Sequence, residues 1–214
     1  SLARSTAALE EVARAGVTTV CLGGDHTVLL AELRALAAVH GPLALVQFDS
    51  HHDLWDEYFG QKLFHGSVVR RALEEGLIDP ARSIQAGLRG SLNAAGDAAM
   101  PRELGLDALT YEELAALGPG RFSERVRNRV GSAPCFLSFD IDFVDPAFAP
   151  GTGTPEVGGP SSREALTYVR SLAGLDFRGF DCVEVSPPFD PAGVTALVAA
   201  NACFEMLSLL AVRR

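Results

Sequence analysis

The sequence has too few basic residues to favour partners that carry negative charge. Its 214 residues include 18 lysines and arginines against 27 aspartates and glutamates, which gives a formal net charge of −9. A chain of this charge lacks the electrostatic attraction that binds nucleic acids and anionic membrane surfaces. We therefore expect neither as a partner, whereas an acidic site would suit a cationic substrate.

Long apolar runs and paired cysteines are also missing. No run approaches the roughly 20 apolar residues that a membrane-spanning helix needs. The first 16 residues lack the apolar core of a secretion signal. The 4 cysteines show no Cys-x-x-Cys spacing, so we expect reduced thiols and a cytoplasmic protein.

The order of the predicted elements indicates an α/β fold. Strands are expected in short apolar or β-branched runs, at 17–22, 43–48, 83–88, 134–140 and 181–185. Helical patterns fall near 5–15, 27–39, 66–76, 110–117, 122–130, 162–173 and 192–211. This alternation is typical of right-handed crossovers and a mostly parallel sheet with helices on both faces. We predict one three-layer αβα domain over residues 1–214.

Acidic and imidazole residues follow or end four of the five predicted strands. They are His26, Asp49, His51, Asp53, Asp140, Asp142 and Glu184. In an open parallel sheet, ligands bind beyond the carboxyl ends of the strands. A turn, a helix cap or a polar loop could explain each segment alone, but such coincidences are not expected at all four. We therefore predict a site at this edge of the sheet.

Strand alternation suggests how these side chains are grouped. Asp140 and Asp142 would point to one side of an extended segment, so that both could face one ion. The same alternation groups Asp49 with His51 and Asp53. His52 would then point away from the site.

The donor atoms of this set suit a particular kind of metal. The set is rich in carboxylate oxygen, includes imidazole and has no thiolate. This disfavours structural zinc and suits Mn²⁺ or a similar hard divalent ion. The four aspartates would be balanced by two divalent ions, and such pairs activate a shared water.

Five segments resemble the ureohydrolase (arginase/agmatinase) family. They are GGDHT (23–27), FDSHHD (48–53), LFHGSVVRR (63–71), SFDIDFVDPAFAPGTGTPEVGG (138–159) and DCVEVSPPFD (181–190). The resemblance runs from about residue 10 to the C-terminus and is strongest to the agmatinase and guanidino-acid hydrolase branch. It implies an arginase-like fold, a homo-oligomer (a trimer or hexamer), and a missing N-terminal segment that the family usually carries.

The resemblance also assigns roles to residues. One of two manganese ions would be held by His26, Asp49, Asp53 and Asp140. The other would be held by His51, Asp49, Asp140 and Asp142, so that Asp49 and Asp140 bridge. Glu184 would pair with the guanidinium group of the substrate. His65 would help to protonate the departing amine, and Thr154 would line the substrate pocket.

The family hydrolyses the C–N bond of a linear amidine and releases urea and an amine. We expect agmatine as the substrate and putrescine as the product, which would place the chain in polyamine metabolism. A guanidino-acid hydrolase, acting for example on guanidinobutyrate, is the alternative, and Arg89 could anchor its substrate's carboxylate. In another class, a metal-dependent amide deacetylase on the same fold would need one ion. A dinucleotide site is excluded because no G-x-G-x-x-G opens a helix.

Overall fold

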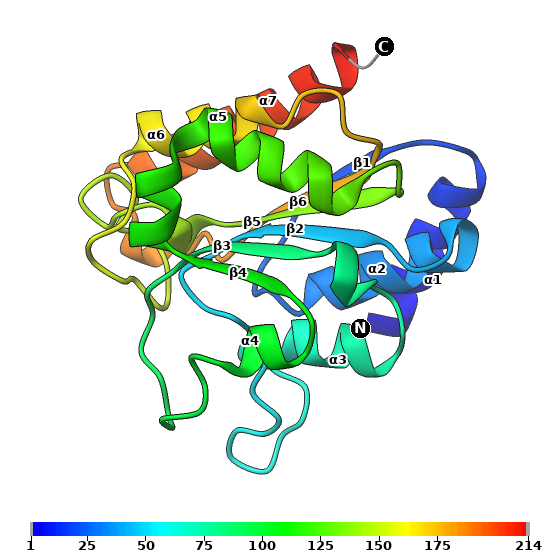
Figure 1. Ribbon diagram of the computed structural model, residues 1–214, viewed down its shortest axis with the longest axis horizontal. Helices are drawn as coiled ribbons and strands as arrows, with labels where there is room; N and C mark the ends of the chain where they lie inside the picture. Colours follow the sequence, from blue (N-terminus) through cyan, green and yellow to red (C-terminus); the bar gives the residue numbers. More distant parts are fainter. Residues whose placement is uncertain (1, 213–214) are drawn as a thin grey trace.

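A computed structural model describes residues 2–212. Its six strands form one sheet with the order β1-β6-β5-β2-β3-β4 (Figure 1). They are β1 (Thr19–Leu22), β2 (Ala44–Phe48), β3 (Ile84–Leu88), β4 (Asp107–Thr110), β5 (Cys135–Asp140) and β6 (Phe177–Val183). All pairs are parallel, so the carboxyl ends of all six strands lie at one edge.

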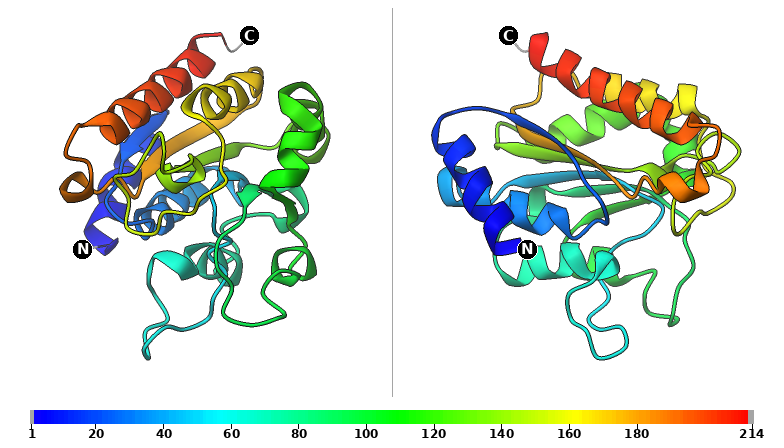
Figure 2. Two further views of the ribbon diagram at one scale, coloured as in Figure 1. Left: turned by 90° about the vertical axis from the view of Figure 1, so that its left-hand side faces the viewer. Right: turned by 180° about the vertical axis from the view of Figure 1, so that it is seen from behind.

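Helices cover both faces of the sheet (Figures 1 and 2). One face carries α1 (Leu2–Arg14), α2 (Val28–His40), α3 (Val68–Glu74) and α4 (Met100–Glu103). The other carries α5 (Tyr111–Val130), α6 (Ser162–Ser171) and α7 (Val194–Ala211). The predicted three-layer α/β fold is therefore confirmed.

Two parts of the fold differ from the sequence prediction. The four-residue edge strand β4 and the short helix α4 were not predicted, because neither is long enough to show a periodic pattern. The helices predicted at 110–117 and 122–130 join as α5, with a break at Gly118. Gly118 has a φ of 67°, which glycine adopts without steric cost before the proline that follows.

A cluster of phenylalanines fixes the ends of the two central strands. The ring of Phe48 lies 5.6 Å from that of Phe122, 6.1 Å from Phe139 and 5.0 Å from Phe143, centroid to centroid. All four side chains are fully buried, and tilted contacts of this kind are favourable. Phe48 and Phe139 directly precede Asp49 and Asp140 in the sequence. The packing of these rings in the core therefore fixes the positions of the first predicted ligands.

Helix α7 is long and apolar enough, by length and composition, to cross a membrane, contrary to the expectation that no apolar run approaches this length. A third of its residues are buried. Val198, Ala202 and Met206 pack into the core between the sheet and the helices α5, α6 and α7. Its opposite side leaves Leu197 and Phe204 exposed. In this structure α7 covers one face of the sheet, and the outer side of α7 is itself exposed.

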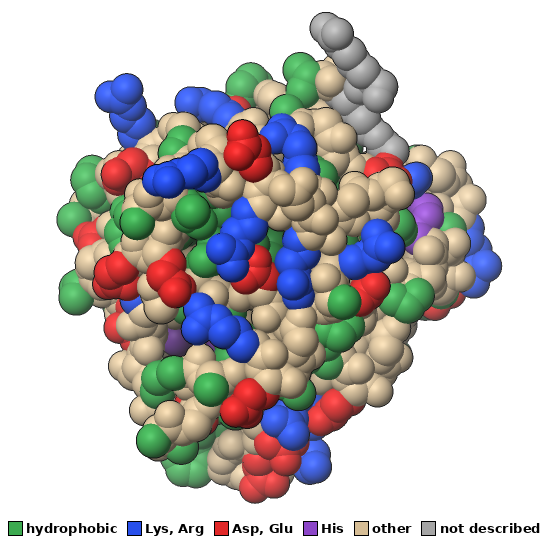
Figure 3. Space-filling model, viewed as in Figure 1, with side chains coloured by type: hydrophobic (Ala, Val, Ile, Leu, Met, Phe, Trp, Pro, Cys, Tyr) green, Lys and Arg blue, Asp and Glu red, His purple; other side chains and the backbone are tan. Residues whose placement is uncertain are grey.

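The negative net charge does not produce a uniformly acidic surface. Figure 3 shows basic and acidic side chains interspersed on the face that carries α5, with several basic side chains over that helix. Four aspartates at the carboxyl ends of the strands are instead buried, each with an exposure of 4% or less. Some of the acidic residues therefore lie inside the molecule rather than on its surface.

Candidate metal centre and active site

The site lies where the progression of the chain across the sheet reverses. From β2 the chain continues to β3 and β4 on one side, whereas β5 and β6 lie on the other. The connections diverge at such a point and leave a crevice beyond the carboxyl ends of the strands. Phe48 of β2 is the register partner of Phe139 of β5. The sheet thus brings Asp49 and Asp140, the next residue in each strand's path, side by side.

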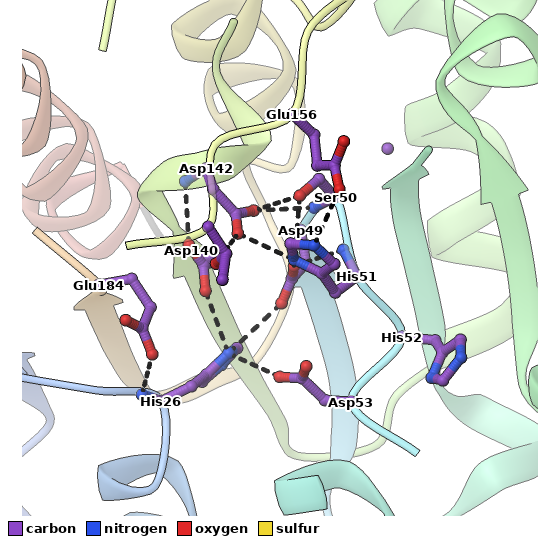
Figure 4. A network of polar contacts seen from close by, with 12 residues as sticks. His26, Asp49, Ser50, His51, His52, Asp53, Asp140, Asp142, Glu156 and Glu184 are labelled. Atoms are coloured by element: carbon purple, nitrogen blue, oxygen red, sulfur yellow. Dashed lines mark hydrogen bonds and ion pairs between the residues drawn. The ribbon is translucent and has the colours of Figure 1, made fainter. Parts of the chain in front are cut away.

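His26, in the turn just before α2, faces the carboxylates of Asp49, Asp53 and Asp140 (Figure 4). Its Nδ1 lies 2.8 Å from Asp53 and 3.3 Å from both Asp49 and Asp140. All four side chains are buried. The segment that contains His26 is more than 20 residues from each of its partners in the sequence, so only the fold assembles this group.

His51 forms a second group beside the first. Its Nδ1 lies 2.9 Å from Asp142 and 3.6 Å from Asp49. Asp49 therefore faces both imidazoles, with one carboxylate oxygen toward each. The donor atoms of His26, Asp49 and Asp53, and those of Asp49, His51 and Asp142, are close enough to hold one metal ion each. Asp140 lies beside the first group through its contact with His26.

The structure brings the six predicted ligand residues together, but not by strand alternation. Asp53 has a φ of 53°, in the left-handed region rather than in an extended segment. Asp142 lies in the single-turn helix η3 (Ile141–Phe143), where its N–H donates to the carboxylate of Asp140 at 2.9 Å. The extended geometry that we predicted is wrong, because turns direct these side chains inward. His52 does point away from the cluster (Figure 4).

Burial and crowding control the charges of the cluster. Burial raises the pKa of Asp53 to about 6, and the charge of Asp49 acts in the same direction. Burial also raises the pKa of Asp140, reinforced by Asp142 and Asp49. Burial acts to lower the pKa of His51, but Asp142 and Asp49 outweigh it and raise that pKa to about 12. The cluster therefore strongly attracts positive charge.

The residues present fit divalent cations. Within residues 2–212, no lysine or arginine forms an ion pair with the four carboxylates. Nδ1 of His26 is buried near three carboxylates, yet none of these contacts has the geometry of a hydrogen bond. A buried group of four acids needs compensating charge. Two metal ions would supply it and would also use the unpartnered nitrogen.

Two residues that the sequence analysis missed set the tautomer of His26. Its Nε2 lies 2.8 Å from the hydroxyl of Ser138, which donates its single proton to Asp181 at 2.8 Å. Ser138 must therefore accept the Nε2–H of His26, which leaves the lone pair of Nδ1 for a metal. Strand alternation could have identified Ser138, because it stands two residues before Asp140.

The predicted strand that has no acidic or imidazole residue at its end also contributes to the site, because the segment after it supports His51. A Cβ atom on Gly90, just after β3, would lie 2.4 Å from Cδ2 of His51. On the same side, Oε1 of Glu156 lies 3.6 Å from Nε2 of His51 and accepts hydrogen bonds from the N–H and hydroxyl of Ser91. The loops after β3 and β5 thus hold this imidazole from behind.

Glu184 and His65 lie beside the metal cluster. Oε1 of Glu184 accepts the N–H of His26 at 2.7 Å and lies 3.8 Å from Nδ1 of His65. Glu184 follows the last residue of β6, whereas the prediction placed it inside a strand. Its φ is 65°. Such a conformation costs energy in a residue other than glycine and is common at functional sites. Burial raises the pKa of Glu184.

A cavity of about 250 Å³ opens onto the cluster. Asp140 and Asp142 form part of its lining, together with His65 and Thr154. The hydroxyl of Thr154 donates to Asp142 at 3.3 Å, so this predicted pocket residue also contacts a predicted ligand. The size of the cavity suits a small molecule.

The guanidinium of Arg89, which we considered as a carboxylate anchor, is engaged by the backbone in this structure. Its guanidinium donates to the backbone carbonyls of Gly87 at 3.2 Å, Asp142 at 2.8 Å and Glu156 at 2.9 Å. It therefore joins the end of β3 to η3 and to the loop after β5. Among the described residues that line the cavity, none is a lysine or arginine.

The fold and the site define an α/β protein with a buried carboxylate–imidazole metal centre at the carboxyl ends of its central strands. Residues 1–208 match the arginase family. The chain belongs to this family, which confirms the predicted resemblance.

Three curated relatives show the range of the similarity. Guanidinopropionase of Pseudomonas aeruginosa is 49% identical over 99% of this chain and 66% of its own length. Guanidinobutyrase of the same organism is 46% identical over 91% and 61%, respectively. The mitochondrial agmatinase of Gallus gallus is 41% identical over 94% and 59%. The chain thus spans about two thirds or less of the length of these relatives.

A solved structure supports the same assignment. Proclavaminate amidino hydrolase from Streptomyces clavuligerus superposes with a TM-score of 0.94 at 39% sequence identity. The superposition covers 100% of this chain and 71% of the other. The arginase-like fold therefore extends over the length of this chain.

Proposed function

We propose that this protein hydrolyses a small guanidino acid to urea and an amino acid at a centre of two manganese ions. The observation that carries the proposal is the cluster of His26, His51 and four buried aspartates, with Glu184 and His65 beside it. Guanidinopropionase and guanidinobutyrase share more identity with the chain than the agmatinase does. This order supports a guanidino acid over the agmatine that we first expected.

The predicted ligands would hold the two ions in overlapping sets. His26, Asp49, Asp53 and Asp140 would hold one, and His51, Asp49, Asp140 and Asp142 the other. When bound, a pair of divalent ions supplies Lewis-acid activation of water near neutral pH. Because the carboxylates are buried, the effective dielectric constant around them is lower than in bulk water. This strengthens electrostatic interactions within the site.

The remaining residues would bind the substrate and move protons. Only Oε1 of Glu184 is engaged by the N–H of His26, so its other oxygen can accept a hydrogen bond from a guanidinium group. His65 has a side chain that is 44% exposed, and it can exchange its proton with solvent. It would deliver that proton to the nitrogen of the departing amine, which leaves poorly when unprotonated.

Agmatine is the second candidate, and the cavity itself favours it. A guanidino acid ends in a carboxylate, whereas agmatine ends in an ammonium group. The described lining has no lysine or arginine to meet a carboxylate, and it does include Glu156. Charge therefore suits the ammonium end, while similarity to relatives favours the acid.

Urea release by the manganese-loaded protein tests the proposal. Guanidinopropionate, guanidinobutyrate, agmatine and arginine would be compared at equal concentrations, with Glu184→Gln as the inactive control that still binds metal. We expect the highest kcat/KM with one of the two guanidino acids, and preference for agmatine would select the second candidate. Two bound ions without urea from any substrate would contradict the ureohydrolase reaction, and one ion with amide deacetylation would support the deacetylase.

We also propose a cytoplasmic homo-oligomer, a trimer or hexamer. The four cysteines are free thiols, which suits a reducing compartment. Light scattering of the purified protein measures the number of subunits.

A further inference from the structure

Glu32 is an unusual residue for the second turn of a helix. Its side chain is buried inside α2, with an exposure of 2%, although glutamate is rarely buried without a partner. Neither of its carboxylate oxygens has a hydrogen-bond partner among the described residues. Its surroundings include the apolar Leu29 and Leu33 of the same helix and the thiol of Cys21, which is only a weak donor. Such a group needs a chemical explanation.

A second buried acid with the same defect lies next to it. Asp181 of β6 has an exposure of 0%, and its Oδ2 also lacks a partner. The carboxylates of Glu32 and Asp181 are close enough for a hydrogen bond once one of them carries a proton. A single shared proton would therefore satisfy both acids, whereas two ionised carboxylates would repel each other.

Glu32 is the partner that carries this proton. Burial raises its pKa well above the usual range, and the charge of Asp181 acts in the same direction. Burial raises the pKa of Asp181 as well, but Asp181 accepts two other hydrogen bonds that act against this, from the Ser138 hydroxyl at 2.8 Å and the Phe139 N–H at 3.2 Å. Hydrogen bonds of this kind favour the ionised form of a carboxyl group.

The resulting chain of hydrogen bonds ends at the metal centre. The acid proton of Glu32 and the hydroxyl proton of Ser138 both point to Asp181, and Ser138 accepts from Nε2 of His26. If Asp181 lost the bond to Glu32, its carboxylate could turn away from Ser138. Ser138 could then donate to Nε2 of His26, which would place the imidazole proton on Nδ1 and block the metal-binding lone pair.

We propose that Glu32 is a positioning residue for the metal centre. As a neutral acid, Glu32 acts through Asp181 and Ser138 to hold His26 in its metal-binding tautomer. The inference rests on the proposed metal function. It concerns a residue that is not part of the cavity lining.

Two substitutions at this position separate the possible roles of Glu32. Glu32→Gln keeps a donor, because the amide NH₂ can donate to Asp181. Glu32→Leu has a similar size and suits the apolar surroundings, but it has no donor. We expect Mn²⁺ binding of the Gln variant to equal that of the unchanged protein, and the Leu variant to bind the His26-side ion on the order of tenfold more weakly.

The measurements are a Mn²⁺ titration followed by the electron paramagnetic resonance of free ion, and infrared spectroscopy of the carboxyl C=O stretch. Glu11→Leu, at an exposed position of α1, is the matched control and should bind like the unchanged protein. In the manganese-loaded proteins, in which the site aspartates are ionised by the bound metal, the protonated-carboxyl band should be present in the unchanged protein and in the control, and missing in Glu32→Gln. Circular dichroism verifies that each variant is folded.

Each other result overturns the inference. Full Mn²⁺ affinity in Glu32→Leu would reduce Glu32 to packing, and equal weakening in both variants would show that its negative charge is needed. No protonated-carboxyl band in the unchanged protein would remove the neutral acid, and this readout stands even if Glu32→Leu does not fold. If the unchanged protein binds no Mn²⁺, the proposed function fails together with the inference, whereas two tightly bound ions without an effect of Glu32→Leu contradict the inference alone.

Discussion

Gly90 shows how a single missing side chain can shape the metal centre. The backbone passes so close to His51 that a Cβ atom would lie 2.4 Å from Cδ2 and 2.7 Å from Nε2 of the ring. A ring displaced by this contact would no longer direct Nδ1 at Asp142 and Asp49. At the scale of the residue, the ligand geometry therefore depends on what is absent as well as on the ligands.

We predict that Gly90→Ala weakens binding of the His51-side metal ion on the order of tenfold, as changes in the support of a ligand commonly do. Calorimetric titration with Mn²⁺ measures this effect. Gly96→Ala is the matched control, since nothing lies within 4 Å of a Cβ at that position. Equal affinities of the two variants would show that the loop after β3 yields without moving His51.

Asp140 should affect both ions, because it is the predicted bridge. We expect Asp140→Asn to weaken both by roughly 100-fold, the upper end of the effects seen when partners in a metal site are altered. Elemental analysis after gel filtration measures the manganese retained, with the surface variant Asp56→Asn as control. Loss of one ion with retention of the other would assign Asp140 to a single metal.

At the scale of elements, the long loop after β5 is held in place by one carboxylate. Asp145 accepts the N–H groups of Ala147 at 2.9 Å, Gly158 at 2.7 Å and Gly159 at 3.0 Å. Burial acts to raise the pKa of Asp145, but these backbone donors outweigh it and lower that pKa. The residues between these contacts form the loop that borders the cavity.

We expect Asp145→Ala to lower the free energy of unfolding by about 1–3 kcal/mol at neutral pH, since it leaves charge-assisted hydrogen bonds unmade. The folded-state pKa lies below the unfolded one, so the stabilisation is complete above the unfolded value of about 3.9 and is lost as pH falls through the folded value. Urea unfolding of both proteins between about pH 7 and pH 3 measures this. A difference that stays constant into acid would show that the charge of Asp145 is not involved.

Arg89 connects three elements, so its loss should not discriminate between substrates. We predict that Arg89→Met reduces stability and lowers kcat/KM for guanidinobutyrate and agmatine by the same factor, because all of its bonds go to backbone carbonyls. Competition between the two substrates gives the ratio directly. A loss confined to guanidinobutyrate would restore Arg89 as the carboxylate anchor.

At the scale of the whole molecule, one surface is conspicuously apolar. Leu197 is 63% exposed, Phe204 64% and Leu207 54%, and their spacing places them on one side of α7. The neighbouring strand β1 is an edge of the sheet, where Leu22 is 77% exposed. Exposed apolar residues that gather on one side of a helix, as on α7, are typical of contacts with other chains.

We predict that this chain associates with copies of itself through the outer side of α7. The double variant Leu197→Lys, Phe204→Lys should shift the mass measured by light scattering toward the monomer, because two charges cannot be buried there without partners. Leu104→Lys, which changes an exposed leucine after α4, should leave the mass unchanged. An assembly that survives the double variant would place the interface elsewhere.

Much of this protein follows from local sequence patterns. A strand is present at each of the five predicted places, although β6 (Phe177–Val183) begins and ends earlier than the predicted 181–185, and most helices were predicted. Buried parallel strands are short apolar runs, and the helices between them have their own periodicity. The metal-ligand types were also visible at the strand ends. Burial inside a parallel sheet leaves its carboxyl edge as the place where polar residues can gather, so their position there was predictable.

Contacts between distant segments decided the rest. Asp53 and Asp142 reach the cluster through a left-handed residue and a single-turn helix, which alternation could not show. Arg89 donates to backbone carbonyls of separate elements, and Glu32 is a buried acid beside Asp181. Both arrangements exist only because segments far apart in the sequence pack together. The sequence alone determined which donors are present and at which strand ends they stand. Only the tertiary structure decided their orientation, burial and partners, because desolvation and hydrogen bonding depend on neighbours that the chain brings together by folding.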